Sequence, residues 1–367
     1  MTSAPLPIRP ELAGLEPYGA PQLDVPVLLN VNENPYAPSE QVVADIAAAV
    51  AAAARGLNRY PDRDFEALRA DLAAYLLAES GVALGVERLW AANGSNEVML
   101  HLLQAFGGPG RTALSFAPTY SMYPEYARDT STAWVAGRRE ADFSLDPDAA
   151  RAAIAAHAPS VVLLASPNNP TGTALPTATI RAVLEAASDV PGGCVVVVDE
   201  AYGEFRRAGT PSALELLDEY AHLAVSRTMS KAFGLAGARV GYLAASRELV
   251  DALRVVRLPY HLSAVTQAVA RAALAHSAEL MAQVGSLRDE RDALVGWLRE
   301  RGLQVADSDA NFVLFGLFDD RRAVWEGLLD RGVLVREVGP PGWLRVSVGT
   351  PQETRAFQDA LVEVAGL

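Results

Sequence analysis

From about residue 89 the sequence repeats one pattern, and this pattern limits the folds open to the chain. A short apolar run is followed by a turn containing Gly, Pro or Asn, and then by a helical segment. The clearest run, Val195–Val198, has no polar break, which is typical of a strand buried on both faces. The candidate strands are Leu89–Ala92, Thr112–Phe116, Trp134–Ala136, Val161–Ala165, Val195–Asp199, Leu223–Ser226 and Val240–Ala244. Their alternation with helices predicts an α/β fold, in which helices cover a mostly parallel sheet.

The flanking segments differ from this repeat. The first forty residues are rich in Pro and lack periodicity, whereas 44–54 and 65–78 have the apolar spacing of helices. A long helical region begins at about Val265. Beyond it we expect strands at Ala310–Phe315, Val333–Val335 and Leu344–Val348, and helices at Arg321–Asp330 and Pro351–Val364. We therefore expect three parts: an arm that joins a small domain (1–45), a large domain (46–262) and a smaller α+β domain (263–367).

Composition excludes several classes of protein. Half of the 367 residues are hydrophobic and the formal net charge is −13, so a well-buried enzyme is expected rather than a partner of nucleic acid or of an anionic membrane. The only cysteine, Cys194, allows no intrachain disulfide. We see no signal peptide and no apolar run of membrane-spanning length, and so expect a cytoplasmic protein. The five histidines lack metal-ligand spacing, so no metal site is expected.

Lysine usage is the most unusual feature of the composition. The chain contains thirty arginines and one lysine, Lys231. Arginine stays protonated at any accessible pH, whereas a lysine amine can lose its proton and form a Schiff base with an aldehyde such as that of pyridoxal phosphate. Composition alone leaves chance as an explanation, and the surrounding residues decide between the two.

Polar residues follow several of the predicted strands, where ligands bind in sheets of this type. After the first strand, Gly94 and Ser95 open a helix whose free backbone N–H groups can bind a phosphate, although many such turns only cap a helix. Ser166–Gly172 follows another strand. Its Asn169 can donate a hydrogen bond to a ring hydroxyl, while an ordinary Asx-Pro turn is the alternative.

Asp199 stands at the end of the valine-rich strand. A buried carboxylate is costly unless it meets a cation, and a protonated pyridine nitrogen is such a cation. Tyr202, three residues later, can reach a phenolic oxygen on the same ring. A helix N-cap is the competing explanation for Asp199.

The last of these loops contains the lysine. Thr228 and Ser230 flank Lys231 with hydroxyl groups, and Arg239 follows eight residues later. Hydroxyls with an arginine form a phosphate-binding cup through charge-assisted hydrogen bonds. The loop therefore predicts a phosphate anchor beside the amine that would bind the aldehyde.

Three of these loops together resemble the fold-type-I pyridoxal-phosphate aminotransferases: Ser166–Gly172, Asp199–Tyr202, and Ser230-Lys231 with Arg239. The motifs occur in the same order as in that family, and the resemblance extends over nearly the whole chain. The resemblance implies a seven-stranded large domain, a small domain built from the two chain ends, and pyridoxal 5'-phosphate as cofactor. It implies that Lys231 bonds to the cofactor aldehyde, that Asp199 pairs with the pyridinium nitrogen, and that Tyr202 and Asn169 hold the ring oxygen. The implied phosphate ligands are Gly94, Ser95, Asn96, Thr228, Ser230 and Arg239, and Tyr120 would stack on the ring unless it is simply a core tyrosine.

Other segments narrow the resemblance. Five segments resemble the histidinol-phosphate aminotransferases: Asn30–Tyr36, Arg59–Asp62, Pro259-Tyr260, Ala310–Phe312 and Leu344–Thr350. These enzymes exchange an amino group between histidinol phosphate/imidazole acetol phosphate and glutamate/2-oxoglutarate in histidine biosynthesis. The resemblance assigns the anionic substrate group to Tyr18, Asn32, Tyr260, Arg336 and Arg345. It also implies a homodimer with shared sites, in which Tyr60 reaches the cofactor phosphate of the partner.

Alternatives remain at this stage. Arg336 could be a solvated strand-end charge, and Tyr60 could merely stack on its neighbouring proline. An aromatic (phenylalanine) aminotransferase or a phosphothreonine decarboxylase would use almost the same scaffold. A ligand sensor of the type found in transcription regulators would need an additional N-terminal DNA-binding domain. A nicotinamide-binding enzyme would need a G-x-G-x-x-G motif, which the glycines at 234, 237 and 241 do not form.

Overall fold

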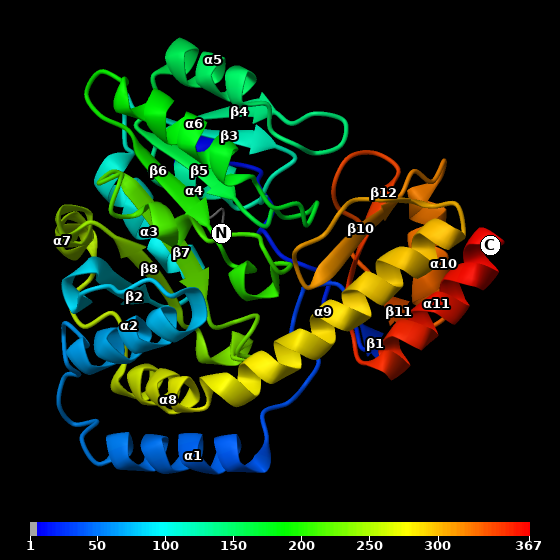
Figure 1. Cartoon of the computed structure of the whole chain (residues 1–367), viewed down its shortest axis with the longest axis horizontal. Coiled ribbons are helices and arrows are strands. Elements are labelled where there is room, and N and C mark those ends of the chain that lie inside the picture. Colours follow the sequence, from blue (N-terminus) through cyan, green and yellow to red (C-terminus); the bar gives the residue numbers. More distant parts are fainter. Residues whose placement is uncertain (1–5) are drawn as a thin grey trace, which may run out of the picture.

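The computed structural model describes residues 6–367, and its centre is a seven-stranded sheet (Figure 1). The strands are β2 (Leu89–Ala92), β3 (Thr112–Ala117), β4 (Ala133–Arg138), β5 (Val161–Ala165), β6 (Val195–Asp199), β7 (Leu223–Thr228) and β8 (Gly241–Ala245). They follow the order β2-β8-β7-β6-β5-β3-β4, and β8 alone runs antiparallel to its neighbours. The predicted α/β class and mostly parallel sheet are confirmed.

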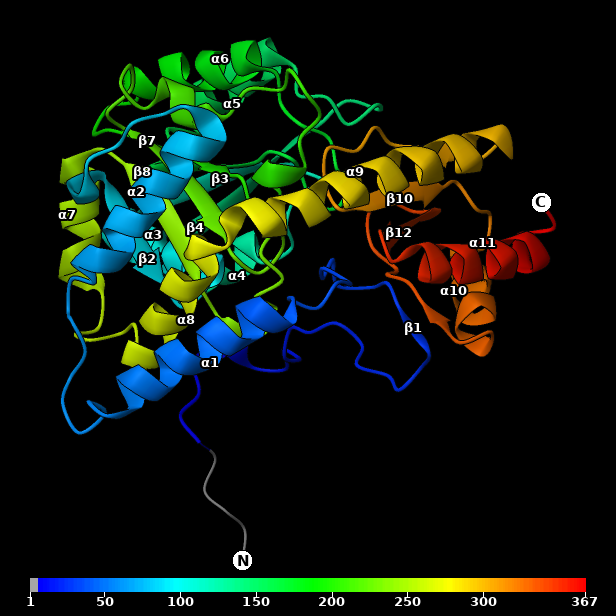
Figure 2. The ribbon, with the colours of Figure 1, turned by 60° about the horizontal axis from the view of Figure 1, so that its bottom comes forward.

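Helices cover both faces of this sheet, since every residue of β5, β6 and β7 is buried. The helices of this part are α2 (Glu66–Ser80), α3 (Ser95–Phe106), α4 (Tyr123–Asp129), α5 (Pro147–His157), α6 (Thr177–Ser188), α7 (Arg247–Val256) and α8 (Ala264–Ala275). Helices α5 and α6 pack side by side, while α3 packs against α7 and β8. Helix α1 (Glu40–Ala54) lies outermost and packs along α8 (Figure 2).

A smaller α+β unit lies beside the large sheet. Its antiparallel sheet has β10 (Phe312–Gly316) between β12 (Trp343–Ser347) and β9 (Gln304–Val305). The helices α9 (Ser277–Glu300), α10 (Arg321–Asp330) and α11 (Pro351–Ala365) pack around it. Near the start of the chain, β1 (Val27–Leu28) pairs in parallel with β11 (Val333–Leu334). Both chain ends therefore build the small unit, as predicted.

The two hydrophobic cores meet along α9. Leu280, Val284 and Leu287 on its first half belong to the core of the large sheet, whereas Leu294 and Leu298 on its second half belong to the small core. Helix α8 also contributes to the large core. The division at residues 45 and 262 stays a prediction; from the packing, we propose that the large domain extends into the middle of α9.

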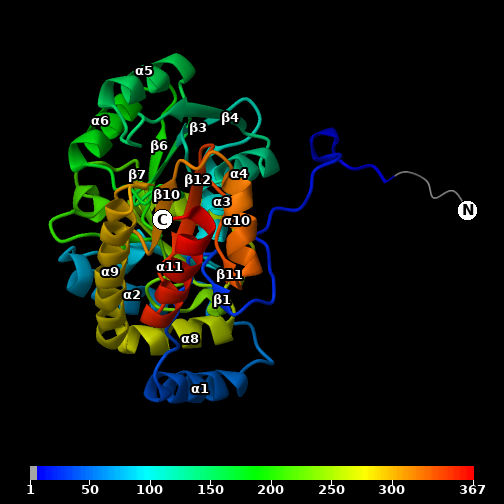
Figure 3. The ribbon, with the colours of Figure 1, turned by 90° about the vertical axis from the view of Figure 1, so that its right-hand side faces the viewer.

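Residues 6–15 extend away from the body of the molecule (Figure 3). They include a short 3₁₀ helix (Pro10–Leu12) and expose Leu6, Ile8 and Leu15. Among residues 6–367, no helix combines the length and the apolar character that a membrane span requires.

Candidate active site

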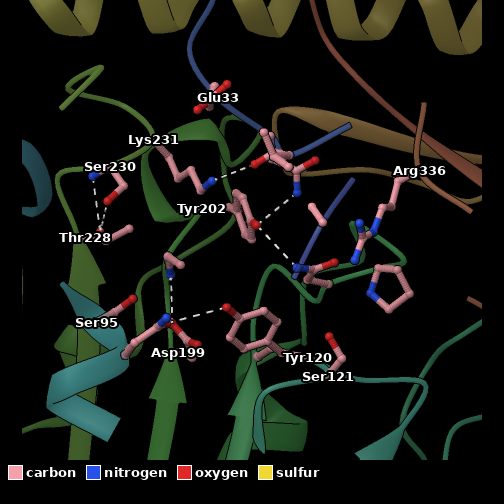
Figure 4. A pocket seen from close by; sticks show the side chains of 18 of the residues that line it. Glu33, Ser95, Tyr120, Ser121, Asp199, Tyr202, Thr228, Ser230, Lys231 and Arg336 are labelled. Atoms are coloured by element: carbon pink, nitrogen blue, oxygen red, sulfur yellow. Dashed lines mark hydrogen bonds between the residues drawn. The ribbon is translucent and has the colours of Figure 1, made fainter. Parts of the chain in front are cut away.

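A cavity of about 330 Å³ lies where β5, β6 and β7 end, between the large sheet and the small unit (Figure 4). Most of the site residues predicted from the sequence meet there. Those that line the cavity are Tyr18, Asn32, Ser95, Asn96, Tyr120, Asn169, Asp199, Tyr202, Thr228, Ser230, Lys231, Arg239, Arg336 and Arg345. Gly94 lies next to the guanidinium group of Arg239, which is part of the cavity wall. Tyr60 and Tyr260 are not among the residues that line it.

One end of the cavity can bind a phosphate. Helix α3 begins there at Ser95 after Gly94, whose φ of 89° is in the left-handed region. Among residues 6–367, the backbone N–H groups of Ser95 and Asn96 have no acceptor, so both can point to an anion at the positive end of the helix dipole. The hydroxyls of Thr228 and Ser230 lie 3.0 Å apart on the same side.

Two glycines allow these parts to approach closely. A Cβ on Gly94 would lie 2.6 Å from Nη2 of Arg239. A Cβ on Gly241, the first residue of β8, would overlap the backbone nitrogen of Ser95. Only glycine at both positions brings the helix start, the arginine and β8 into one cup.

Asp199 lies at the floor of the cavity. Its carboxylate accepts hydrogen bonds from the Tyr123 hydroxyl (3.0 Å) and the Ala201 amide (3.2 Å). Among residues 6–367, no cationic side chain pairs with it. Burial therefore raises the pKa of Asp199 from 3.8 to about 6, although both hydrogen bonds oppose the shift. A buried carboxylate without a cation is a binding site for a positively charged group.

Lys231 extends from the loop after β7, and its Nζ donates to the Val31 carbonyl oxygen at 3.0 Å. Burial, and then the positive charge of Arg345, lower the pKa of Lys231 from 10.5 to about 8, against the opposing effect of Glu33. A larger fraction of this amine than of an ordinary lysine is therefore neutral near neutral pH. A neutral amine can attack an aldehyde or accept a proton.

Tyr202 lies between Lys231 and Tyr120 (Figure 4). Its phenolic oxygen accepts hydrogen bonds from Nδ2 of Asn32 (3.0 Å) and Nδ2 of Asn169 (3.4 Å). With both lone pairs occupied, the hydroxyl proton is available for an acceptor in the cavity.

The opposite end of the cavity is cationic. Arg345 donates to Oδ1 of Asn169 (2.6 Å) and to the Asn30 carbonyl oxygen (2.8 Å), while its buried Nε has no partner among residues 6–367. Burial lowers the pKa of Arg345 to about 10. Arg336 stands opposite Arg345 in an antiparallel bridge, so both side chains project from the same side. No acidic side chain in the described part of the chain pairs with either, so the site can bind an anion.

Tyr18 and Tyr120 form part of the wall. The Tyr18 hydroxyl lies 2.8 Å from Oγ of Ser121, and the Tyr120 hydroxyl donates to Oδ1 of Asn96 at 3.5 Å. Outside the cavity, Tyr60 and Tyr260 stack on each other with ring centroids 4.4 Å apart. Tyr60 is 80% exposed and Tyr260 is 39% exposed, which is unusual for two stacked aromatic side chains.

Sequence reasoning missed several polar residues of this site. Tyr123 donates to Asp199 and lies three residues after Tyr120, where a stacking aromatic is expected. Ser347 contacts Asn32, and the alternation of β12, which places it on the same face as Arg345, is its signal in the sequence. Glu33 lines the cavity beside Lys231 and belongs to the Asn30–Tyr36 segment that carries part of the resemblance.

Residues 25–361 match the family model of aminotransferase class I and II. The chain belongs to this family. It is 62% identical to the histidinol-phosphate aminotransferase of Thermobifida fusca, over 98% of this chain and 96% of that protein. It is 55% identical to that of Mycolicibacterium smegmatis, over 100% of this chain and 95% of the relative.

Solved structures agree with this fold. A putative histidinol-phosphate aminotransferase from Erwinia carotovora atroseptica superposes with a TM-score of 0.82 at 26% identity, covering 95% of this chain and 99% of that one. The histidinol-phosphate aminotransferase of Sinorhizobium meliloti, solved in complex with pyridoxal 5'-phosphate, gives 0.85 at 24% identity and covers 99% of each chain. The prediction of a fold-type-I aminotransferase is confirmed.

Pyridoxal 5'-phosphate is the cofactor of this aminotransferase. Within residues 6–367, the groups present fit it at three separate points: unpaired amides at the start of α3 for the phosphate, the carboxylate of Asp199 without a cation for the ring nitrogen, and the Lys231 amine for the aldehyde.

Proposed function

We propose that the chain transfers an amino group between L-histidinol phosphate and 2-oxoglutarate, giving imidazole acetol phosphate and glutamate, in histidine biosynthesis. The observation that carries the proposal is the pair Arg336 and Arg345, which face the same cavity as Lys231 without an acidic partner in the described chain. Histidinol phosphate presents a phosphate where glutamate presents its α-carboxylate. Guanidinium groups bind both, so one pair can serve both substrates. The names of relatives at 55–62% identity support the same reaction.

In this proposal, the sequence-predicted residues hold the cofactor as the resemblance implies. Lys231 would bond to the aldehyde, Asp199 would pair with the ring nitrogen, and Tyr202 and Asn169 would hold the ring oxygen. Tyr120 would stack on the ring. The phosphate would be held by Gly94, Ser95, Asn96, Thr228, Ser230 and Arg239. When bound, pyridoxal phosphate supplies an electron sink that stabilises negative charge on the substrate Cα.

The remaining work falls to side chains of this protein. Arg345 and Arg336 fix the anionic group of the substrate, with Tyr18 and Asn32 beside them, and so orient the Cα hydrogen toward Lys231. Once the substrate amine has displaced it from the aldehyde, the free Lys231 amine, with its pKa lowered to about 8, would take the proton from the substrate Cα as a general base.

We also propose a homodimer with shared sites. Tyr60 and Tyr260 stack outside the cavity of their own subunit, and Leu57, Val255 and Leu258 nearby in sequence are exposed as well. Exposed apolar side chains on two adjoining loops are typical of a protein interface. In the dimer, Tyr60 reaches the cofactor phosphate of the partner and Tyr260 reaches its substrate. The single buried Cys194 suits reducing conditions, and we place the enzyme in the cytoplasm.

The direct test is a set of half-reactions. Purified holoenzyme is mixed separately with histidinol phosphate, phenylalanine and phosphothreonine, without a keto acid, and loss of the cofactor colour is followed together with release of carbon dioxide. We expect histidinol phosphate to bleach the colour with the highest kcat/KM and without carbon dioxide. Preferential bleaching by phenylalanine would identify an aromatic aminotransferase. Carbon dioxide from phosphothreonine would identify a decarboxylase.

A further inference from the structure

Two asparagine amides donate to the same oxygen of Tyr202, and the direction of these hydrogen bonds decides what Tyr202 can do. An amide has an accepting oxygen and a donating nitrogen of nearly equal shape, so its neighbours must fix which end faces Tyr202. If both nitrogens face the phenolic oxygen, its lone pairs are occupied and its proton points elsewhere. If one amide is reversed, Tyr202 donates its proton to that amide oxygen instead.

Arg345 fixes the first amide. Its Nη1 lies 2.6 Å from Oδ1 of Asn169, and a guanidinium group only donates. The oxygen of Asn169 must therefore face Arg345, which leaves Nδ2 for Tyr202.

Ser347 fixes the second amide. Its Oγ accepts the backbone N–H of Asn32 at 2.8 Å, and its own O–H donates to Oδ1 of Asn32 at 3.1 Å. Among residues 6–367, Oδ1 of Asn32 is the only acceptor of this serine proton. Reversing the amide would leave the Ser347 hydroxyl proton buried without an acceptor, which is unfavourable. The nitrogen of Asn32 therefore faces Tyr202, at 3.0 Å.

The backbone of Asn32 is held equally firmly. Its φ of 56° is in the left-handed region, and Nδ2 of Asn311 donates to its carbonyl oxygen at 3.0 Å. The exposed fractions of Asn32, Asn311 and Ser347 are 1%, 0% and 4%, so solvent cannot replace these bonds. Both Asn311 and Ser347 come from the C-terminal part of the chain, whereas Tyr202 belongs to the loop after β6.

We propose that Ser347 is a positioning residue, which orients the Asn32 amide so that Tyr202 directs its hydroxyl proton into the cavity, toward the ring oxygen of pyridoxal phosphate. Arg345 and Ser347 occupy alternate positions of β12 and so project from the same face of the strand. A single strand of the small sheet thus orients both amides around Tyr202. The inference rests on the proposed placement of the cofactor and is independent of the substrate.

The test is a pH titration of the visible absorbance of the holoenzyme without substrate. An O–H donated to the ring oxygen stabilises its negative charge, and thereby favours loss of the proton from the bound cofactor. In Ser347→Ala the Asn32 amide is free to turn, so the midpoint should rise by roughly half to one pH unit, the scale of one hydrogen bond. Ser347→Thr, which keeps the hydroxyl, should titrate within roughly 0.2 unit of wild type on the same scale.

Ser347→Cys keeps the size of the side chain with a weaker donor, and should give an intermediate midpoint even if Ser347→Ala folds poorly. An unchanged midpoint in both Ser347→Ala and Ser347→Cys would overturn the proposal. So would an equal shift in Ser347→Thr, because that would trace the effect to packing. Failure of the half-reaction with histidinol phosphate would leave this titration unaffected, so the two proposals fail separately.

Discussion

At the scale of single residues, the site is marked by buried charges that lack the partners such charges normally have. Asp199 is buried without a cation, and Arg345 without an acid, within the described chain. In the sequence, Asp199 is marked by its place at the end of an apolar strand, whereas Arg345 was assigned by the resemblance and stands within an apolar strand. Tyr123 carries no such mark and Ser347 only its place on the same strand face as Arg345, since the roles of both depend on contacts between segments distant in sequence.

The isolated charge of Asp199 should destabilise the apoprotein in a pH-dependent way. Its pKa in the fold is about 6, above the usual 3.8, so the stability penalty is absent at low pH and complete above about pH 6. Asp199→Asn should therefore stabilise the apoprotein by about 2–3 kcal/mol at pH 8 and by less at pH 5. Urea unfolding at the two pH values measures this, with Asp189→Asn at an exposed position as the control. An equal gain at both pH values would contradict the assignment.

Lys231 should make cofactor capture depend on pH. Only the neutral amine attacks an aldehyde, and the pKa of this amine in the fold is about 8. We expect the rate at which apoprotein binds pyridoxal phosphate covalently to rise with pH and to level off above about pH 8. Stopped-flow absorbance with excess cofactor gives this profile. A rate that keeps rising to pH 10 would show an amine with an ordinary pKa.

At the scale of elements, long apolar runs were predicted well and short pairings were not. The strands at 89–92, 161–165 and 195–199 have the bounds expected from sequence, because unbroken apolar residues end where polar turns begin. The two-residue strands β1 and β9 carry no periodicity of their own. The pairing of β1 depends on β11, near the other end of the chain, whereas β9 adds only two residue pairs to the edge of β10.

The close approach of β8 to α3 gives a prediction at this scale. Gly241→Ala places a methyl group on the Ser95 backbone nitrogen, which should push the start of α3 out of the phosphate cup. We expect cofactor affinity to fall by roughly 5- to 160-fold, corresponding to an overpacking cost of about 1–3 kcal/mol. Gly237→Ala is the matched control, because a Cβ there meets nothing within 4 Å. Fluorescence titration of the apoproteins measures both, and equal affinities would contradict the tight cup.

At the scale of the whole molecule, the cavity lies between two units that the chain builds from distant segments. Most of the residues that line the cavity could be predicted from the sequence. That Asn32, Asn169 and Arg345 meet around Tyr202 could not, because they come from segments that only the folded chain brings together. The position of Tyr60 and Tyr260 outside their own cavity could not be worked out from spacing either. It follows from the path of two loops, and the resemblance alone suggested that Tyr60 serves a partner subunit.

Shared sites can be tested by mixing inactive subunits. Lys231→Ala and Tyr60→Ala homodimers should each be strongly impaired, because each of their sites lacks one essential group. A hybrid of the two contains one site with both defects and one site with neither. After co-refolding, transaminase activity should therefore recover to roughly a quarter of the wild-type value, since half of randomly paired dimers are hybrids with one intact site. Recovery to no more than the mean of the two parents would contradict a site shared between subunits.

The account depends most on the bond between Lys231 and the cofactor. The chain has only two kinds of primary amine, the Lys231 side chain and the amino terminus, so chemical fixation gives an unambiguous answer. Holoenzyme is treated with borohydride, digested, and mapped by mass spectrometry. We predict one pyridoxyl-phosphate group per chain on the peptide that contains Lys231. A cofactor released in full, or found at the amino terminus, would contradict the central claim.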